Sequence, residues 1–266
     1  MPILMCPPTH YGIEYEINPW MHVGSPVDRR AAQRQWEGLR STYSRLGVEV
    51  ALAEPVPGLP DMVFTANAGV AHGGRVALSR FRHAERSGEE GHWRDLFEGW
   101  GMPVLDTGDL AFEGAGDALF LGDTLICGHG FRTDREAIPV VARILGVEAV
   151  ALELVDPRFY HLDTCFCPLD PHTALVAPAA FSPDSREALH RLVPRVIEVP
   201  DALALGFACN AMPLGDVVIS STPIEGLAGS LREAGYRAVG LPMGEFLKAG
   251  GGVRCLSLPV GDVSVR

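Results

Sequence analysis

Several features that define whole classes of protein are scarce or missing in this chain of 266 residues. It has six irregularly spaced cysteines, too few for the disulfide framework of a secreted protein. The first eight residues contain no basic region followed by a long apolar core, so we expect no signal peptide. No apolar run is long enough to span a bilayer. These absences predict a cytoplasmic protein whose cysteines are reduced thiols.

Positive charge is also in short supply. The 22 Lys and Arg residues are outnumbered by 33 Asp and Glu, which gives a formal net charge of −11. Such a chain repels nucleic acids and anionic membranes, so we expect neither as a partner, and the charge favours a small cationic substrate. Because 47% of the residues are apolar, the chain is able to bury a large core.

No Pro/Ser-rich linker or low-complexity run divides the chain, and one pattern recurs along it. A short apolar strand leads into a helix and then into a second strand, at a spacing of roughly 45 to 50 residues. The predicted first strands are 75–79, 124–128, 173–177 and 216–220. The predicted helices are 91–100, 133–145, 182–192 and 226–235. The predicted second strands are 103–105, 149–152, 196–199 and 238–241.

The N-terminal part fits as a further copy of this unit, with a strand at 21–24, a helix over 26–46 and a strand at 48–50. Five units therefore fill the chain. The pattern predicts an α/β fold in which strand–helix modules form a closed ring around a central channel. We expect one domain that spans residues 1–266.

The stretch Gly250–Leu258 carries the candidate nucleophile, Cys255. Three consecutive glycines permit a close backbone approach, and we expect them to deliver Cys255 to the start of an apolar strand. A thiol attacks only as thiolate, so it needs partial exposure, nearby N–H groups and a cation or base that lowers its pKa. The alternative is an inert cysteine buried behind a turn.

Two other stretches combine polar residues with small ones. Residues 59–69 are expected to form an apolar strand that ends in Asn67, although an Asn shortly before a Gly is also typical of an ordinary turn. Glu113 and Asp117 lie on either side of a loop of small residues, where backbone can come close.

The stretch 159–167 alternates, which predicts a strand. One face of that strand is expected to carry His161, Asp163, Cys165 and Cys167. These include zinc-ligand types, but no second close pair such as CxxC or HxxxH completes a tetrahedral site, so we expect no metal. A Cys–His hydrolase or transferase needs only one thiolate, one imidazole and carboxylates, and that set is present.

The motifs FEGAGD at 112–117, FYHLDT at 159–164 and GGGVRCLS at 250–257, in this order, resemble those of the guanidine-modifying enzymes. These are arginine deiminase, dimethylarginine dimethylaminohydrolase and the amidinotransferases. The resemblance spans nearly the whole chain and implies their five-bladed β/α propeller, the pentein fold. It implies that Cys255 attacks the guanidino carbon and that His161 protonates the leaving amine and then activates water. Asp163 and Glu113 would clamp the guanidinium, with Asp117 of the same FEGAGD motif also assigned to substrate binding.

By the same resemblance, Arg86 and Arg132 match arginines that hold the substrate's α-carboxylate, a task suited to the guanidinium fork. An ordinary surface charge is the alternative for either arginine. The chain departs from the deiminases by carrying Asn67 in place of an aspartate and by one extra residue in the loop after Glu113. An amide can also bind a neutral ureido group, and Asn18 is a second candidate amide.

The opening MCPP, with INPWM and FTANAG, is similar to the arginine dihydrolases, which release ornithine, carbon dioxide and two ammonia. We therefore expect a cofactor-free arginine dihydrolase, in preference to a deiminase or a methylarginine hydrolase. An amidinotransferase would use the same thiolate and histidine but pass the amidino group to an amine. A pentein that serves only as a binding scaffold would lack the Cys, His and acid set. The expected partner is arginine or a methylated arginine, and a homo-oligomer stays possible.

Overall fold

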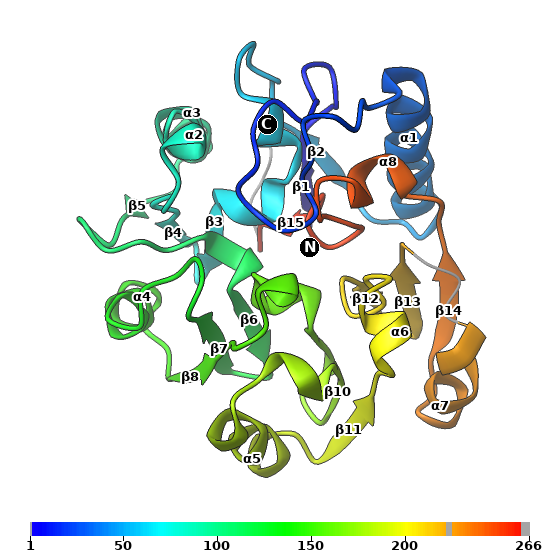
Figure 1. Ribbon diagram of the computed structural model, residues 1–266. Helices are drawn as coiled ribbons and strands as arrows, with labels where there is room; N and C mark the ends of the chain where they lie inside the picture. The colour runs from blue at the N-terminus through cyan, green and yellow to red at the C-terminus, as the bar shows by residue number, and fades with distance from the viewer. Residues whose placement is uncertain (1, 222–224, 262–266) are drawn as a thin grey trace.

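Five three-stranded sheets stand around a common axis, with the longer helices on the outside (Figure 1). The computed structural model describes residues 2–221 and 225–261. In every sheet the inner strand pairs antiparallel with a middle strand, which pairs parallel with an outer strand. The inner strands are β3 (Gly69–His72), β6 (Ala118–Leu121), β9 (Phe166–Asp170), β12 (Met212–Leu214) and β15 (Leu258–Pro259). The predicted ring of five modules is confirmed.

The middle and outer strands match most of the predicted ranges within one or two residues. The middle strands are β1 (Ile3–Met5), β4 (Arg75–Leu78), β7 (Thr124–His129), β10 (Thr173–Val176) and β13 (Val217–Ser220). The outer strands are β2 (Val50–Leu52), β5 (Val104–Leu105), β8 (Ala149–Glu153), β11 (Arg195–Glu198) and β14 (Arg237–Gly240). The ring is closed by the two ends of the chain, since Leu258 of β15 pairs with Leu4 of β1.

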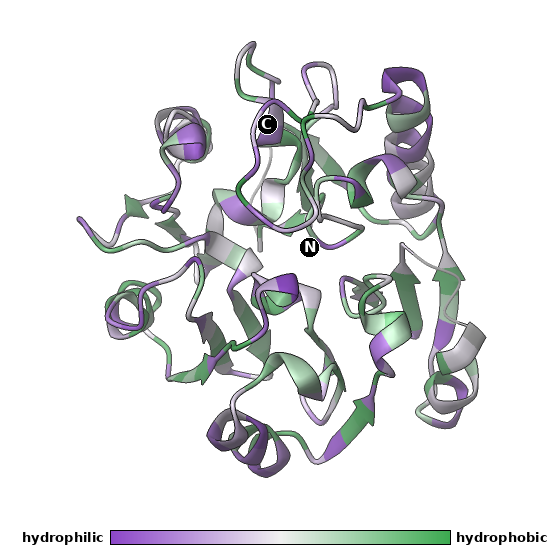
Figure 2. Ribbon diagram, viewed as in Figure 1, coloured by the Kyte–Doolittle hydropathy of each residue, from purple (hydrophilic) through white to green (hydrophobic). Residues whose placement is uncertain are grey.

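Helices fill the connections from middle to outer strands. They are α1 (Arg29–Arg45), α3 (Glu89–Gly99), α4 (Ala137–Leu145), α5 (Pro183–Leu192) and α7 (Ala228–Glu233). Asp28 is the N-cap of α1, and its side chain accepts hydrogen bonds from the backbone N–H groups of Arg30 and Ala31. Its buried face carries Trp36 and Leu39 at helical spacing. Figure 2 shows apolar colour on most of the strands and hydrophilic colour on much of α1 and α5.

Shorter helical segments include α2 (Ala84–Ser87), α6 (Asp201–Ala204), α8 (Gly244–Leu247) and the 3-10 turn η7 (Glu225–Leu227). The helix predicted over 133–145 begins only at Ala137, and the one predicted over 226–235 is divided between η7 and α7. No helix in the described part of the chain is both long and apolar enough to cross a membrane.

Three predicted strands were wrong. Residues 21–24 form no strand, and the strand of that module is β1 instead. Residues 59–67 form two 3-10 turns, η1 (Pro60–Val63) and η2 (Thr65–Ala68), and the proline at the start of η1 suits a helical turn. Residues 162–164 form the turn η5 (Leu162–Thr164), because the Thr164 hydroxyl donates to the His161 carbonyl at 2.6 Å and closes the turn. Strand β9 begins only at Phe166.

A tight turn therefore precedes each inner strand. Turn η2 leads into β3, η3 (Gly114–Gly116) into β6 and η5 into β9. Residues 205–210 lead into β12 and residues 253–256 into β15 in the same way. Because the five inner strands are equivalent around the ring, these five turns meet at one end of the channel.

Candidate active site

Cys255 lies in the turn before β15, not at the start of a strand as predicted, and only 3% of its surface is exposed. Its Sγ lies 3.3 Å from Asp163 Oδ2 and 3.1 Å from the Nδ2 of Asn210. Burial, and then the Asp163 carboxylate, raise the pKa of the Cys255 thiol well above its ordinary value. The predicted partial exposure was wrong, and the thiol carries its proton in the free protein.

Asn210 is a site residue that the sequence reasoning missed. Its Oδ1 accepts from three backbone N–H groups, those of Gly252 at 3.0 Å, Arg254 at 3.1 Å and Cys255 at 3.3 Å. Its Nδ2 donates both to Cys255 Sγ and to the Asp163 carbonyl, at 3.2 Å. One side chain thus fixes the whole glycine-rich turn and touches the thiol. A signal was present, because FTANA at 64–68 and FACNA at 207–211 are the same pattern in two modules.

His161 and Glu113 face each other from neighbouring turns. His161 Nε2 lies 2.8 Å from Glu113 Oε2, which also accepts from Arg132 Nη1 at 2.8 Å. Burial opposes ionisation of Glu113, but Arg132 and then His161 hold its pKa well below the usual range. Glu113 is therefore a carboxylate that accepts the Nε2 proton and fixes the ring orientation of His161.

Asp163 is fully buried, yet one of its two oxygens is spare. Oδ2 contacts Cys255 Sγ, whereas Oδ1 has no hydrogen-bond donor among the described residues. Burial raises the pKa of Asp163 to about 7, against the opposing influence of Arg254 first and then of Cys255 and Asn210. An acceptor left open beside the thiol suits an N–H donor that carries positive charge.

Asp117 has a different environment, because the protein engages both of its oxygens. Oδ2 accepts from the Thr133 hydroxyl at 2.8 Å and Oδ1 from the Leu162 backbone N–H at 3.0 Å. The carboxylate therefore joins turn η3 to turn η5 and sets the position of His161. Burial raises its pKa to about 6, with His161 lowering it.

Asn67 lies between Arg86 and the Glu113 backbone. Its Oδ1 accepts from Arg86 Nη1 at 2.9 Å, and its Nδ2 donates to the Glu113 carbonyl at 3.1 Å. Gly116 lies against this amide and against His161: a Cβ at that position would collide with Asn67 Nδ2 and lie 3.2 Å from His161 Nδ1. Asn67 and the imidazole are thus neighbours across Gly116.

The two predicted carboxylate-binding arginines are both buried and already paired. Arg86 donates from Nε and Nη2 to the two oxygens of Glu89, at 2.7 and 2.9 Å. Arg132 donates to Glu113 and, from Nη2, to the Ile17 carbonyl at 2.8 Å, and its guanidinium carbon lies 4.9 Å from the centre of the Tyr160 ring. Neither arginine is an ordinary surface charge.

Asn18 lies in the N-terminal segment beside the glycine-rich turn. Its Nδ2 donates to the Ala249 carbonyl at 3.1 Å, and its Oδ1 accepts from the backbone N–H of Trp20 and Met21. Gly250 has φ 79°, and a Cβ there would lie 2.9 Å from the Trp20 ring. The amide of Asn18 therefore holds the segment against the turn that carries Cys255.

Among the described residues, no three His, Cys, Asp or Glu side chains are grouped so that they could hold a metal ion. Cys165 and Cys167 are buried in the apolar core. What remains at this end of the channel is a thiol, an imidazole with its carboxylate partner, and an open carboxylate oxygen.

The comparison with known families agrees with this geometry. The family described as "N,N dimethylarginine dimethylhydrolase, eukaryotic" matches residues 23–261. The chain belongs to this family of hydrolases. An N(G),N(G)-dimethylarginine dimethylaminohydrolase of Mycobacterium tuberculosis is 44% identical over 96% of this chain and 84% of its own.

A bifunctional arginine dihydrolase/ornithine cyclodeaminase of Synechocystis sp., ArgZ, is 45% identical over 98% of this chain, which spans only 38% of that longer protein. The solved N-terminal domain of ArgZ with its substrate superposes with a TM-score of 0.94 over 97% of both chains, at 44% identity. Dimethylarginine dimethylaminohydrolase of Pseudomonas aeruginosa, at 20% identity, shares the fold with a TM-score of 0.80 over 97% of this chain and 98% of that one. The predicted pentein propeller is confirmed.

Proposed function

We propose that this protein is an arginine dihydrolase, which converts arginine and two waters into ornithine, carbon dioxide and two ammonia. The observation that carries the proposal is Asn67, an amide beside His161 and Glu113 in a site otherwise built for a cationic guanidinium. A carboxylate there could only accept hydrogen bonds, whereas an amide both accepts and donates. The amide suits a neutral ureido group as well as a guanidinium.

Binding of the substrate would begin at Asp163. The open Oδ1 can accept a guanidinium N–H, and the arriving positive charge stabilises the thiolate of Cys255, because Sγ lies 3.3 Å from the same carboxylate. Raising the thiol's pKa by burial thus keeps the nucleophile protonated until a cation is present. The amide of Asn210 then supports the sulfur with an N–H donor.

The first hydrolysis follows from these positions. The Sγ proton of Cys255 passes to His161, Sγ bonds to the guanidino carbon, and one C–N bond breaks as the leaving nitrogen takes that proton from His161 and departs as ammonia. His161, oriented by Glu113, then removes a proton from water, which attacks the thiouronium carbon. The C–S bond breaks and citrulline remains.

In the second hydrolysis the ureido carbon of citrulline is attacked before the molecule leaves. A second ammonia departs with a proton from His161, and water releases the carbamate of ornithine, which loses carbon dioxide. Asn67 supports this round because, beside its bonds to Arg86 and the Glu113 carbonyl, Nδ2 keeps a second N–H for the ureido oxygen and Oδ1 a second lone pair for a ureido N–H. Asn18 contributes by holding the N-terminal segment over the turn that carries Cys255.

Arg132 and Arg86 are proposed to hold the α-carboxylate. In the free protein the fork of Arg86 is bound to Glu89, and Arg132 donates from Nη1 to Glu113 and from Nη2 to the Ile17 carbonyl, so either arginine must exchange a present partner for the carboxylate. Arg86 also orients Asn67.

Hydrolysis of dimethylarginine to citrulline is the second candidate. The family match over residues 23–261 and the Mycobacterium tuberculosis relative, of which this chain covers 84%, favour it. It would use Cys255, His161 and Asp163 in the same way but would stop after one hydrolysis.

Product stoichiometry on L-arginine, without added metal, tests the proposal. Two ammonia per ornithine, with no accumulation of citrulline, is the expected result. One ammonia per citrulline would contradict it, as would turnover of dimethylarginine alone. An added amine such as glycine should leave the products unchanged, because an amidinotransferase would consume it.

The variant Asn67→Asp sharpens this test, because aspartate keeps the acceptor for Arg86 and loses the Nδ2 donor. We expect it to release citrulline, with the first hydrolysis slowed by less than about tenfold, which is 1.4 kcal/mol in the barrier. If Asn67→Asp still forms ornithine at the original ratio, Asn67 does not support the second round.

A further inference from the structure

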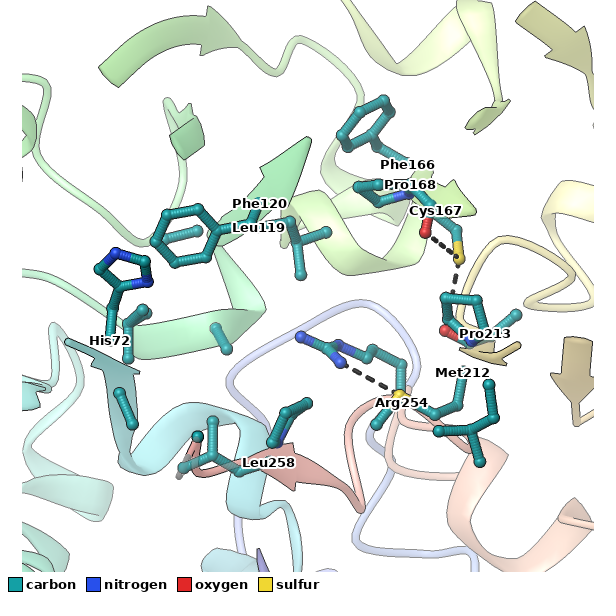
Figure 3. A pocket seen from close by; sticks show the side chains of 18 of the residues that line it. His72, Leu119, Phe120, Phe166, Cys167, Pro168, Met212, Pro213, Arg254 and Leu258 are labelled. Carbon is teal, nitrogen blue, oxygen red and sulfur yellow. Dashed lines mark hydrogen bonds between the residues drawn. The ribbon is translucent and has the colours of Figure 1, made fainter. Parts of the chain in front are cut away.

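A cavity lies among the five inner strands, away from the Cys255 thiol (Figure 3). Its volume is about 660 Å³, in the range of small-molecule sites. Every inner strand contributes to its wall, through Ala71 of β3, Phe120 of β6, Pro168 of β9, Pro213 of β12 and Leu258 of β15. The exposed glycines of the β3–β4 turn, Gly73 and Gly74, lie at its edge.

The wall is largely apolar, and its polar side chains are the half-buried imidazole of His72, which stacks on Phe120, and Arg254. Among the described lining residues Arg254 is the one that carries a full charge, and Figure 3 shows its guanidinium reaching into the middle of the cavity. Nη1 lies 3.2 Å from the Met212 sulfur, a weak acceptor. Nε is buried and has no hydrogen-bond partner among the described residues, and no ion pair found there includes Arg254.

Arg254 is half-buried, and its guanidinium has no hydrogen-bonded counter-charge among the described residues, so solvent or a ligand in the cavity must balance its charge. Two fully buried arginines of this chain have a counter-charge: Arg86 pairs with Glu89, and Arg132 pairs with Glu113. Arg254 differs from both, although all three lie near the channel.

We propose that this cavity is a binding site for a small organic carboxylate with an apolar body, whose carboxylate pairs with Arg254. The fork of Arg254 matches the two oxygens of a carboxylate, and the apolar strands receive the hydrocarbon part. A monoanion balances the single positive charge, whereas a phosphate would bring up to two negative charges into an otherwise apolar space.

Binding there has a consequence at the catalytic end. The backbone N–H of Arg254 donates to Asn210 Oδ1, which also holds Cys255. The positive charge of Arg254 is the largest influence that lowers the pKa of Asp163. An anion on Arg254 would cancel part of that influence, favour protonated Asp163 and weaken the binding of a guanidinium. By linkage, guanidinium and carboxylate ligands would oppose each other to the same degree.

The charges around Asp163 are few. Arg254 and Cys255 approach it from the turn before β15, and Asn210 contacts it without titrating. Tyr160 and the core thiols Cys165 and Cys167 also sense its charge, but burial raises the pKa of each and keeps them neutral. Arg254 is therefore the group through which an anion in the cavity acts on Asp163.

The test uses 4-phenylbutanoate as the probe and calorimetry or ligand-observed NMR as the readout. We expect saturable binding, with the neutral 4-phenylbutanamide at least about tenfold weaker, which is 1.4 kcal/mol. Arg254→Gln should weaken the carboxylate by the same factor and leave the amide unchanged. Ala71→Phe, which fills the cavity from β3, should weaken both compounds.

Arg132→Gln serves as the matched control, because it removes an arginine from the catalytic end while leaving the cavity intact. Circular dichroism checks that each variant is folded. Equal binding by wild type and Arg254→Gln would overturn the proposal. Loss of binding in Arg132→Gln but not in Arg254→Gln would place the anion at the catalytic end and overturn it as well. If 4-phenylbutanamide bound as tightly as 4-phenylbutanoate, the charge of Arg254 would have no role in binding, which would also overturn the proposal.

Discussion

The two ends of the channel are built on the same five inner strands and differ sharply in chemistry. At the catalytic end, the turns before the strands carry Asn67, Asp117, Asp163, Asn210 and Cys255, all buried. At the far end, the strands themselves present Phe120, Pro168, Leu214 and other apolar residues, with His72 and the charged Arg254 as the exceptions. The difference lies in the backbone, because a turn leaves N–H and C=O groups that buried polar side chains can satisfy, and a strand uses them in its ladder.

The two ends of the channel also differ in how their charged groups are paired. At the catalytic end Glu113 and Asp117 are paired with a cation or with several donors, as Glu113 is with Arg132 and His161, whereas Asp163 keeps an oxygen open among the described residues. At the far end the guanidinium of Arg254 has mainly apolar neighbours. Arg254 connects the two, since its backbone belongs to the Cys255 turn and its side chain to the cavity.

Removing the thiol at the catalytic end should abolish turnover. We expect Cys255→Ala to lose at least about 10⁴-fold in kcat, because no other group at that position can form the covalent adduct. Cys209→Ala is the matched control: this buried core thiol should cost some stability and leave kcat unchanged. Ammonia release and thermal unfolding measure the two effects, and measurable turnover by Cys255→Ala would exclude it as the nucleophile.

Crowding the catalytic end should be nearly as damaging. Gly116→Ala places a methyl group against the Asn67 amide and the His161 ring, so we expect kcat/KM to fall by about 100-fold as the imidazole moves. Gly38→Ala in α1 meets nothing within 4 Å and should stabilise the protein by about 0.5 to 1 kcal/mol. Equal activity in both variants would show that the neighbours of Gly116 have room to shift.

Two replacements of Asn210 distinguish its role as acceptor for the glycine-rich turn from its role as hydrogen-bond donor to Cys255 Sγ. Asn210→Ala leaves three backbone N–H groups without their acceptor, and we expect a loss of about 1 to 3 kcal/mol of stability together with a large fall in kcat. Asn210→Asp keeps the acceptor and loses the donor to Sγ, so it should regain most of the stability and not the kcat. Recovery of both by aspartate would leave the amide donor without a role.

Titration of Asp163 should appear in the pH profile. Its pKa is raised to about 7, so below that pH it is protonated, the clamp for the guanidinium is lost, and kcat/KM falls by up to about tenfold per pH unit. Arg254→Gln removes the main influence that lowers this pKa, so the acid limb should move to higher pH. Arg232→Gln in α7 is the control and should leave the profile in place. If the acid limb of the kcat/KM profile stayed in place in Arg254→Gln, the charge of Arg254 would not act on Asp163, and the two ends of the channel would be electrostatically independent.

Much of the architecture was predictable because it depends on local patterns. Apolar β-branched runs such as 124–128 and 173–177 form strands in any module, and the recurring spacing indicated a ring. Besides 21–24, the wrong strand predictions lie in the stretches that carry site residues: 59–67 is apolar and 159–167 alternates, yet both contain 3-10 turns. Hydrogen bonds such as that of Thr164 to the His161 carbonyl close the second of these. Asn210 was missed because its three backbone partners lie more than 40 residues away.

The sequence by itself determined the five modules, the chemical types available at the catalytic end and the family, because spacing, patterning and motif order are properties of the chain. Only the tertiary structure decided which polar groups meet, that Asp163 keeps one oxygen open, that Arg86 is taken up by Glu89, and that Arg254 faces an apolar cavity. The physical reason is that burial and pairing depend on neighbours brought together from distant modules. Closure of the ring by β15 against β1 supplies those neighbours.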